Sequence, residues 1–237
     1  MIKFFRKIRY KLVEQNKTGR YFKYAIGEIV LVVIGILIAL QINNWNQQRQ
    51  NRQKEANILK QIHKDFKSNK VQLDSIKVNN QEVVYSCNQI IALMPFQKKK
   101  SEFDTIGKYL GKVFSVKTFN PSNGSIEALI NSSTFDVIRN DTLRNLLVSW
   151  KDVYKDYTEE EQYARDLQIW ELLPFIRKNI YLVDAYCDHN FNVMGTPEFQ
   201  NMWFDKRQSV QEVLDAIRDE RVEHYINEII RLTKDHD

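Results

Sequence analysis

The stretch from Tyr24 to Ile42, with the sequence YAIGEIVLVVIGILIALQI, constrains the fold of this chain more than any other. It is 19 residues long, and residues 29–40 carry no charged side chain. A helix of this length can cross a hydrocarbon core of about 30 Å, and it satisfies its own backbone hydrogen bonds in lipid. No small-x-small cleavage site follows it. The sequence therefore predicts an uncleaved signal-anchor over residues 24–42, with a cleaved signal peptide or a buried helix of a soluble protein as the alternatives.

Aromatic and small residues indicate how this segment would lie in a membrane. Aromatic rings that prefer the membrane–water interface stand near its two ends, namely Tyr21, Tyr24 and Trp45. A spacing of four residues creates one face of the helix, made of Gly27, Leu31, Gly35 and Ala39. Because small residues let two membrane helices approach closely, this face is predicted to associate with another helix.

Glu28 is the one ionisable residue inside the segment. A charge near the bilayer centre costs at least ~2.5 kcal/mol and usually marks a functional site. Glu28 stands near the basic flank, so pairing with Lys23 or Arg20 in the headgroup zone is the simpler interpretation. A polar contact with a partner helix is the alternative, and for this reason Glu28 joins the predicted association face.

The charge distribution predicts the topology. Residues 1–23 contain eight basic residues and one acidic residue, whereas residues 43–53 contain two basic residues. The positive-inside rule then places the N-terminus in the cytoplasm, as a basic arm able to form an interfacial helix. In a bacterium with two membranes, residues 43–237 would lie in the periplasm, anchored to the inner membrane. Residues 24–237 have 27 basic and 29 acidic residues, which argues against a nucleic-acid-binding domain.

Residues 43–237 predict a mainly α-helical bundle. The chain has only seven Gly and four Pro, too few for the turns of an all-β domain. Residues 43–58 are polar and predict a stalk. From residue 59 to residue 94, an apolar seam with alternating spacings of three and four is typical of a coiled coil or a bundle helix. The seam comprises Leu59, Ile62, Phe66, Asn69, Leu73, Ile76, Asn80, Val83, Cys87, Ile90 and Met94. Its polar positions, Asn69 and Asn80, can fix the register or select a partner.

The middle of the chain gives weaker patterns. A short helix that opens at residues 101–104 is expected to end at Gly111. Alternating apolar residues over 114–119 predict an extended segment, and residues 122–125 are expected to start another helix.

The last hundred residues predict two further long helices. Asp141 is the expected N-cap of the first, which Pro174 would end or kink. Residues 184–208 predict an irregular loop, because they contain Gly195 and Pro197. Ser209, with Glu212 three residues later, matches a capping box at the start of the last helix.

Three stretches resemble a family of uncharacterised single-pass membrane proteins from Bacteroidota. They are MIKFFRKIR, YAIGEIVLVVIGILIALQINNWN and IEALINSSTFDVIRNDTLRNLL. The likeness spans most of the chain and is strongest over residues 1–46 and 126–147. No activity is assigned to that family, so the resemblance implies a single-pass topology and an envelope location only.

Motifs for catalysis, cofactors and metals are missing from the sequence. It has no Walker A, GxGxxG, GxSxG, HExxH or paired CxxC pattern. Glu220, His224 and Glu228 share one predicted helix face, where a surface charge cluster is the simpler interpretation and a metal site the alternative. No catalytic residue, cofactor or metal is therefore predicted.

Two further sets of side chains allow more than one interpretation. Cys87 and Cys187 could pair in an oxidising periplasm, but a buried, inert Cys87 is favoured because it lies on the seam. Cys187 and His189 stand close in sequence, yet neighbours in a loop point apart, so a nucleophile pair is disfavoured. An aromatic stripe, Trp150, Tyr154 and Tyr157, indicates bundle core, with a ligand groove as the alternative.

Three functions remain after these considerations. The first is a non-enzymatic envelope protein that binds another protein or a second copy of itself. The second is a periplasmic sensor that binds a small molecule and signals through a partner. The third is an enzyme of unfamiliar type.

Overall fold

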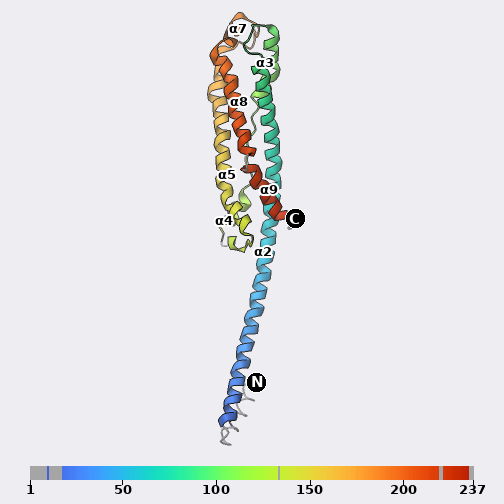
Figure 1. Cartoon of the computed structure of the whole chain (residues 1–237), viewed down its shortest axis with the longest axis vertical. Coiled ribbons are helices and arrows are strands. Elements are labelled where there is room, and N and C mark those ends of the chain that lie inside the picture. Colours follow the sequence, from blue (N-terminus) through green and yellow to red (C-terminus); the bar gives the residue numbers. More distant parts are fainter. Residues whose placement is uncertain (1–9, 11–17, 133, 219–220, 235–237) are drawn as a thin grey trace. The chain divides into compact units, whose positions relative to one another are not determined.

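The computed structural model describes residue 10 and residues 18–132, 134–218 and 221–234. In these residues the elements follow one another as helices without any strand (Figure 1). They are α2 (Thr18–Ile91), α3 (Lys100–Val113), α4 (Gly124–Ile130), the 3-10 helix η1 (Phe135–Val137), α5 (Asp141–Asp166), the π-helix η2 (Leu167–Leu172), α6 (Leu173–Asn179), α7 (Asp188–Met194), α8 (Pro197–Arg218) and α9 (Val222–Thr233). The expected mainly helical chain with a long apolar N-terminal helix is confirmed.

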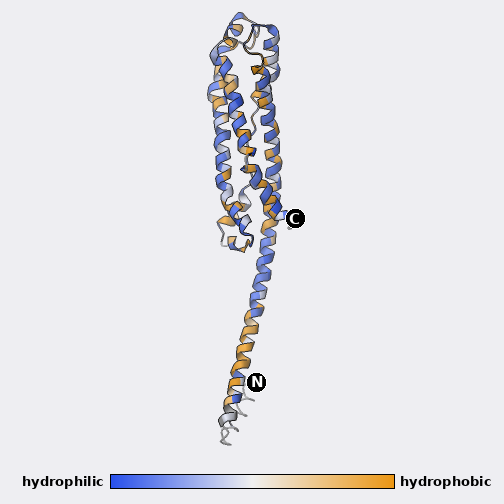
Figure 2. Cartoon of the chain, in the orientation of Figure 1, coloured by the Kyte–Doolittle hydropathy of each residue, from blue (hydrophilic) through white to orange (hydrophobic). Residues whose placement is uncertain are grey.

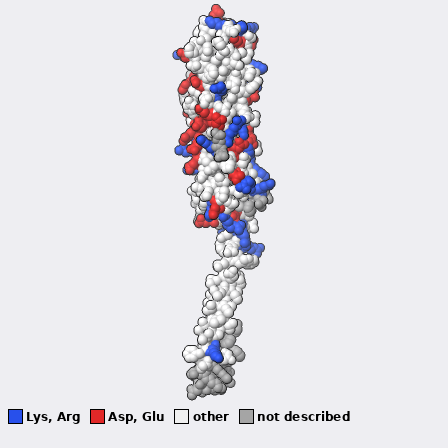
Figure 3. Space-filling model, viewed as in Figure 1, with Lys and Arg blue, Asp and Glu red and all other residues white. Residues whose placement is uncertain are grey.

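Contacts divide the chain into two compact units, Met1–Glu55 and Ala56–Asp237, which we call unit 1 and unit 2. Figure 2 shows the apolar part of α2 in unit 1 in orange. The side chains of this part are solvent-exposed along its length. On the face shown in Figure 3, this stretch is nearly free of charged side chains. Among the described residues, one helix is long and apolar enough to cross a membrane, and none of its most apolar window is buried.

Unit 2 is a bundle built around the later part of α2. Helices α2 and α5 run toward the end that carries α7, and α8 and α9 run back from it (Figure 1). We call the end with α7 distal and the end with Ala56 and α4 proximal. The α2 seam faces the other helices of its own unit, so that Ile62, Phe66 and Leu73 are fully buried. The bundle-helix alternative therefore describes this seam.

Two apolar clusters fill unit 2. The proximal core joins α2, α4, α5, α8 and α9, and its largest side chain is Trp150. The distal core joins α2, α3, η2, α6, α7 and α8, and its largest side chain is Trp203. Burial of these faces provides the main driving force for the bundle.

Residues 115–123 form neither a helix nor a strand, and we call this segment the strap. Polar side chains of the neighbouring helices satisfy its backbone. Asn69 Oδ1 accepts from Ser122 N at 2.8 Å, and Asn69 Nδ2 donates to Ser122 O at 3.2 Å. On α5, the two carboxylate oxygens of Glu161 accept from Phe119 N at 3.2 and 3.0 Å. The extended pattern predicted over residues 114–119 thus corresponds to a segment held by side chains rather than by a sheet.

The expected loop over residues 184–208 is wrong for much of its length. Helix α7 begins at Asp188, and α8 already begins at Pro197. Thr196 Oγ1 accepts from Phe199 N at 3.3 Å, which is the contact of an N-cap, and Pro at the first helical position needs no backbone partner. Ser209 is therefore no cap: it lies inside α8, 1 % exposed, and its hydroxyl donates to Lys206 O.

Two other helix boundaries also differ from expectation. The N-cap of α5 is Asn140, whose side chain accepts from Leu143 N at 2.9 Å, and Asp141 is already helical. Gly111 does not end α3, which continues to Val113.

Pro174 lies in the first turn of α6, directly after the π-helix η2. Proline has no N–H to donate to the preceding turn. The wider π turn accommodates this missing hydrogen bond, so the helical path continues past Pro174.

Candidate functional site

The predicted association face lies on the exposed part of α2 in unit 1. Gly27, Leu31, Gly35 and Ala39 are all solvent-exposed, and Leu31 is 63 % exposed. A Cβ atom added at Gly27 or Gly35 would have no neighbour within 4 Å. Unit 1 itself therefore leaves the face open, and association with a further helix stays a prediction.

The other predicted membrane residues flank this face. Glu28 is half-buried, and Tyr24 and Trp45 are exposed. The side chain of Tyr21 lies outside the described part of the structure.

Asn69 and Asn80 are buried inside unit 2 although both are polar seam positions. Asn69 holds the strap through Ser122, as described above. Asn80 accepts a long hydrogen bond of 3.5 Å from Asn79, and Asn79 in turn binds Ser115 of the strap. Each of these amides thus has a structural role within its own chain, next to the strap.

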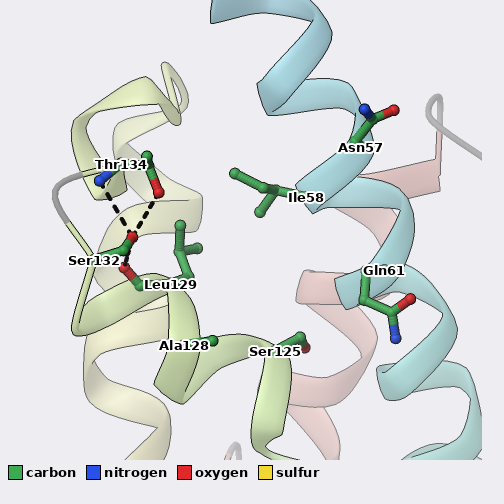
Figure 4. A pocket seen from close by; sticks show the side chains of 8 residues that line it. All are labelled: Asn57, Ile58, Gln61, Ser125, Ala128, Leu129, Ser132 and Thr134. Atoms are coloured by element: carbon green, nitrogen blue, oxygen red, sulfur yellow. Dashed lines mark hydrogen bonds between the residues drawn. The ribbon is translucent and has the colours of Figure 1, made fainter.

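A groove opens at the proximal end of unit 2, between α2 and the segment from α4 to residue 134 (Figure 4). We call it the proximal groove, and its volume is about 360 Å³. Ile58 of α2 extends toward Leu129 of α4 across it. Its lining residues are Asn57, Ile58, Gln61, Ser125, Ala128, Leu129, Ser132 and Thr134.

The lining of the proximal groove is apolar at its centre and neutral at its edge. The hydroxyl of Ser132 donates to Leu129 O at 2.7 Å and accepts from Thr134 N at 3.2 Å. Ser125 Oγ donates to Asp65 of α2 at 2.5 Å. Because these hydroxyls are already bonded, the groove mainly offers apolar contact area. It is suited to an apolar side chain or a small uncharged ligand rather than to a charged substrate.

A second, smaller cavity of about 30 Å³ lies between the strap, α5 and α8. We call it the Lys206 cavity. It is lined by Asn80, Ser115, Val116, Lys117, Glu161, Ala164, Arg165, Lys206, Val210 and Val213. Lys206 is 2 % exposed, and its Nζ donates to Gln168 Oε1 at 2.6 Å. Gln168 Nε2 donates in turn to Phe114 O at 3.2 Å, so the π-helix connects the cavity to the end of α3.

Burial dominates the electrostatics around this lysine. It lowers the pKa of Lys206 from 10.5 to about 8, and the nearby Cys87 opposes this shift. Burial also raises the pKa of the Cys87 thiol to about 12, which Lys206 and Arg207 oppose. The pKa of Glu161 is raised, again by burial. Cys87 is consequently a poor nucleophile, since a thiol reacts as its thiolate.

The other candidate chemistry finds no assembled site in the described residues. Cys87 and Cys187 are both free thiols. The ring of His189 contacts Tyr181 and Asn179 O. No group of three His, Cys, Asp or Glu side chains is placed to hold a metal in the ranges that the structure describes. Glu220 lies outside them, and Glu228 binds Arg231 at 2.7 Å. Trp150 and Tyr157 of the aromatic stripe belong to the proximal core.

The sequence profile of a family of unknown function, DUF6090, matches residues 28–171, more than half of the chain. The chain belongs to the DUF6090 family. No curated protein and no solved structure matches it. The DUF6090 match includes the exposed apolar part of α2 from Glu28 onward and every lining residue of the proximal groove. Helices α6 to α9, and with them Lys206, follow the matched region.

Sequence reasoning missed both the groove and Lys206. The groove combines residues 57–61 with residues 125–134, and no local pattern indicates that these two stretches meet. The sequence does contain a pattern that indicates the burial of Lys206. It falls on a helical repeat of apolar residues that runs through Phe199, Met202, Trp203, Val210 and Val213, all buried. A lysine at such a core position is recognisable once residues 197–218 are identified as one helix.

Proposed function

We propose that this DUF6090 protein is a single-pass, membrane-anchored envelope protein whose unit 2 binds another protein. The observation that carries the proposal is the exposed apolar stretch of α2, which no other described part of the chain covers. Exposed Ile, Val and Leu side chains over such a length are unfavourable in water, and a bilayer offers the surroundings that they require.

The charge of the flanks supports a cytoplasmic N-terminus. Eight basic residues precede the span, and only two follow it within residues 43–53. We infer an inner-membrane location with residues 1–23 as a cytoplasmic arm and residues 43–237 in the periplasm.

The proximal groove supports protein binding by unit 2. It is an apolar, concave feature of the described part of this unit, and its edge is uncharged. It begins at Asn57, which is only 15 residues along the chain from Ile42. A partner anchored in the same membrane could therefore reach it. Grooves of this kind accept apolar side chains of a partner helix or segment.

A small-molecule sensor is the second candidate. The groove volume of about 360 Å³ falls within the range of ligand pockets. A ligand would raise the unfolding temperature of unit 2 by mass action.

The anchor is tested by two arginines in the span. We expect Ile34→Arg combined with Leu37→Arg to release the protein from membranes washed with alkaline carbonate, since each arginine costs ~2.5–3.5 kcal/mol at a helix centre. The matched control is Val71→Arg combined with Val78→Arg, which places the same charges at positions 71 % and 66 % exposed on the same helix. Release of the wild-type chain by carbonate would contradict an anchor.

The groove is tested by photo-crosslinking in intact cells. A photoreactive residue at Gln61, inside the groove, should give a discrete adduct with one partner, whereas the same residue at Val148, 52 % exposed on α5, should not. Ala128→Trp fills the groove and should remove the Gln61 adduct. Equal adducts from both positions, or an adduct that is insensitive to Ala128→Trp, would argue against partner binding there. A ligand-dependent rise in unfolding temperature without an adduct would favour the sensor.

A further inference from the structure

Lys206 is a buried cation that has too few partners. Its ammonium group carries three N–H donors, and one of them binds Gln168 Oε1. In the part of the chain that the structure describes, no carboxylate lies within salt-bridge distance of Nζ. Removing an ammonium group from water costs several kcal/mol unless a counter-charge and further hydrogen bonds replace the water. The site therefore calls for an additional partner for Lys206.

The Lys206 cavity supplies the space for that partner. Its volume of about 30 Å³ exceeds the roughly 10–15 Å³ that one water molecule requires. Its edge includes Val116 and Lys117 of the strap, both solvent-exposed. A small solute can therefore approach between the strap and α5, and the limited volume favours a monatomic ion over a polyatomic ion such as phosphate.

The charges that line the cavity favour an anion. Three of the four ionisable lining side chains are cationic: Lys117, Arg165 and Lys206. The fourth, Glu161, already accepts the Phe119 amide with both carboxylate oxygens. Lys117 likewise donates to Ser75 Oγ at 3.0 Å. Lys117 is solvent-exposed and Arg165 is half-buried, whereas Lys206 is buried, so the charge of Lys206 is the one that water compensates least.

We propose that the Lys206 cavity binds one small monovalent anion, which in a cell would be chloride. A water molecule fits the same volume but leaves the ammonium charge uncompensated. Chloride is only slightly larger than water and accepts several hydrogen bonds, as two N–H groups of Lys206 and the amide NH2 of Asn80 can donate. The inference is independent of the proximal groove and of any partner that binds there.

Anion exchange in purified, detergent-solubilised full chain tests the proposal. We expect sodium chloride to raise the unfolding temperature of unit 2 above its value in sodium gluconate of equal ionic strength, because gluconate is too large for the cavity. Above the dissociation constant, each tenfold increase in chloride should add roughly 3–5 °C. Bromide should act like chloride, whereas sulfate should not. If the wild-type chain unfolds at the same temperature in chloride and in gluconate, the proposal is overturned without the need for a variant.

A matched pair of variants locates the site. Lys206→Met should remove the difference between chloride and gluconate, and Lys155→Met, at an exposed lysine of α5, should preserve it. The broadening of the chlorine NMR line by wild-type protein, and its loss in Lys206→Met, gives a direct readout of the bound ion. Chloride effects of equal size in wild type and Lys206→Met would show general salt binding and overturn the assignment.

Discussion

Replacing Trp150 with Ala is expected to lower the free energy of unfolding of unit 2 by about 3–5 kcal/mol. Trp150 is 2 % exposed, and its ring packs edge-on against Phe66 of α2 at a centroid distance of 5.0 Å. Its Nε1 donates to Asn123 Oδ1 at 2.8 Å, directly before α4. The substitution removes apolar contacts at the centre of the proximal core and leaves the Asn123 oxygen without its partner, so both effects act in the same direction.

Urea unfolding of the full chain in detergent measures this loss. The matched control is Trp170→Ala on the π-helix η2, where the ring is 73 % exposed, and its effect should stay within about 0.5 kcal/mol. Because single domains are stable by only about 5–15 kcal/mol, Trp150→Ala should remove a large fraction of the stability of unit 2. Trp150→Phe, which keeps most of the volume, should lose less. Equal effects of the two Trp→Ala changes would contradict the described core.

Replacing Lys206 with Met is expected to stabilise unit 2 at pH 7 in a buffer without halide, by about 1–2 kcal/mol. Burial lowers the pKa of Lys206 to about 8, so the protonated form is less favourable in the folded chain than in the unfolded chain. Methionine removes the buried charge at similar volume. Part of the gain is lost because Gln168 Oε1 no longer accepts a hydrogen bond.

The pH dependence identifies the origin of this gain. Between pH 8 and about 10.5, the unfolded chain binds the Lys206 proton more strongly than the folded chain, so the stability of the wild type rises with pH. The advantage of Lys206→Met should therefore shrink over this range. The charged and titratable groups around Lys206, namely Cys87, Lys117, Glu161, Arg165 and Arg207, are present in both proteins and largely cancel in the difference. Urea unfolding of both proteins at pH 7 and pH 10 measures this advantage. A difference in free energy of unfolding between Lys206→Met and the wild type that does not change with pH would contradict the buried charge.

Local sequence patterns were sufficient to predict α2. The apolar stretch of α2 and its seam from Leu59 to Ile90 are visible because composition and spacing repeat over many residues. The start of α4 near Gly124 was predictable for a similar reason, since turn-forming residues precede an apolar run. The seam, however, could not distinguish a coiled coil from a bundle. That distinction depends on α8 and α9, which lie more than a hundred residues later in the chain.

Tertiary contacts determine what the sequence left open. The alternating pattern over residues 114–119 predicted an extended segment but not its partners, because Asn69 and Glu161 hold the strap through side chains of distant helices. The start of α8 was missed because Gly195 and Pro197 are typical of loops, although Thr196 and Pro197 also match the beginning of a helix. Ser209 was wrongly predicted as an N-cap, because a Ser followed by Glu three residues later matches the capping-box pattern even inside a helix.

The contact between the first and last helices of unit 2 affects when its core can form during biosynthesis. His63 of α2 hydrogen bonds to Thr233 at 2.9 Å across 170 residues of sequence, and Glu223 of α9 bridges Lys70 and Lys77 of α2. At a synthesis rate of about 5–20 residues per second, α2 emerges roughly 10–30 s before α9. During this interval the proximal part of the seam has no helix α9 to cover it. The nascent chain thus presents a long apolar face to its surroundings, and the proximal core can close only after α9 has been synthesised.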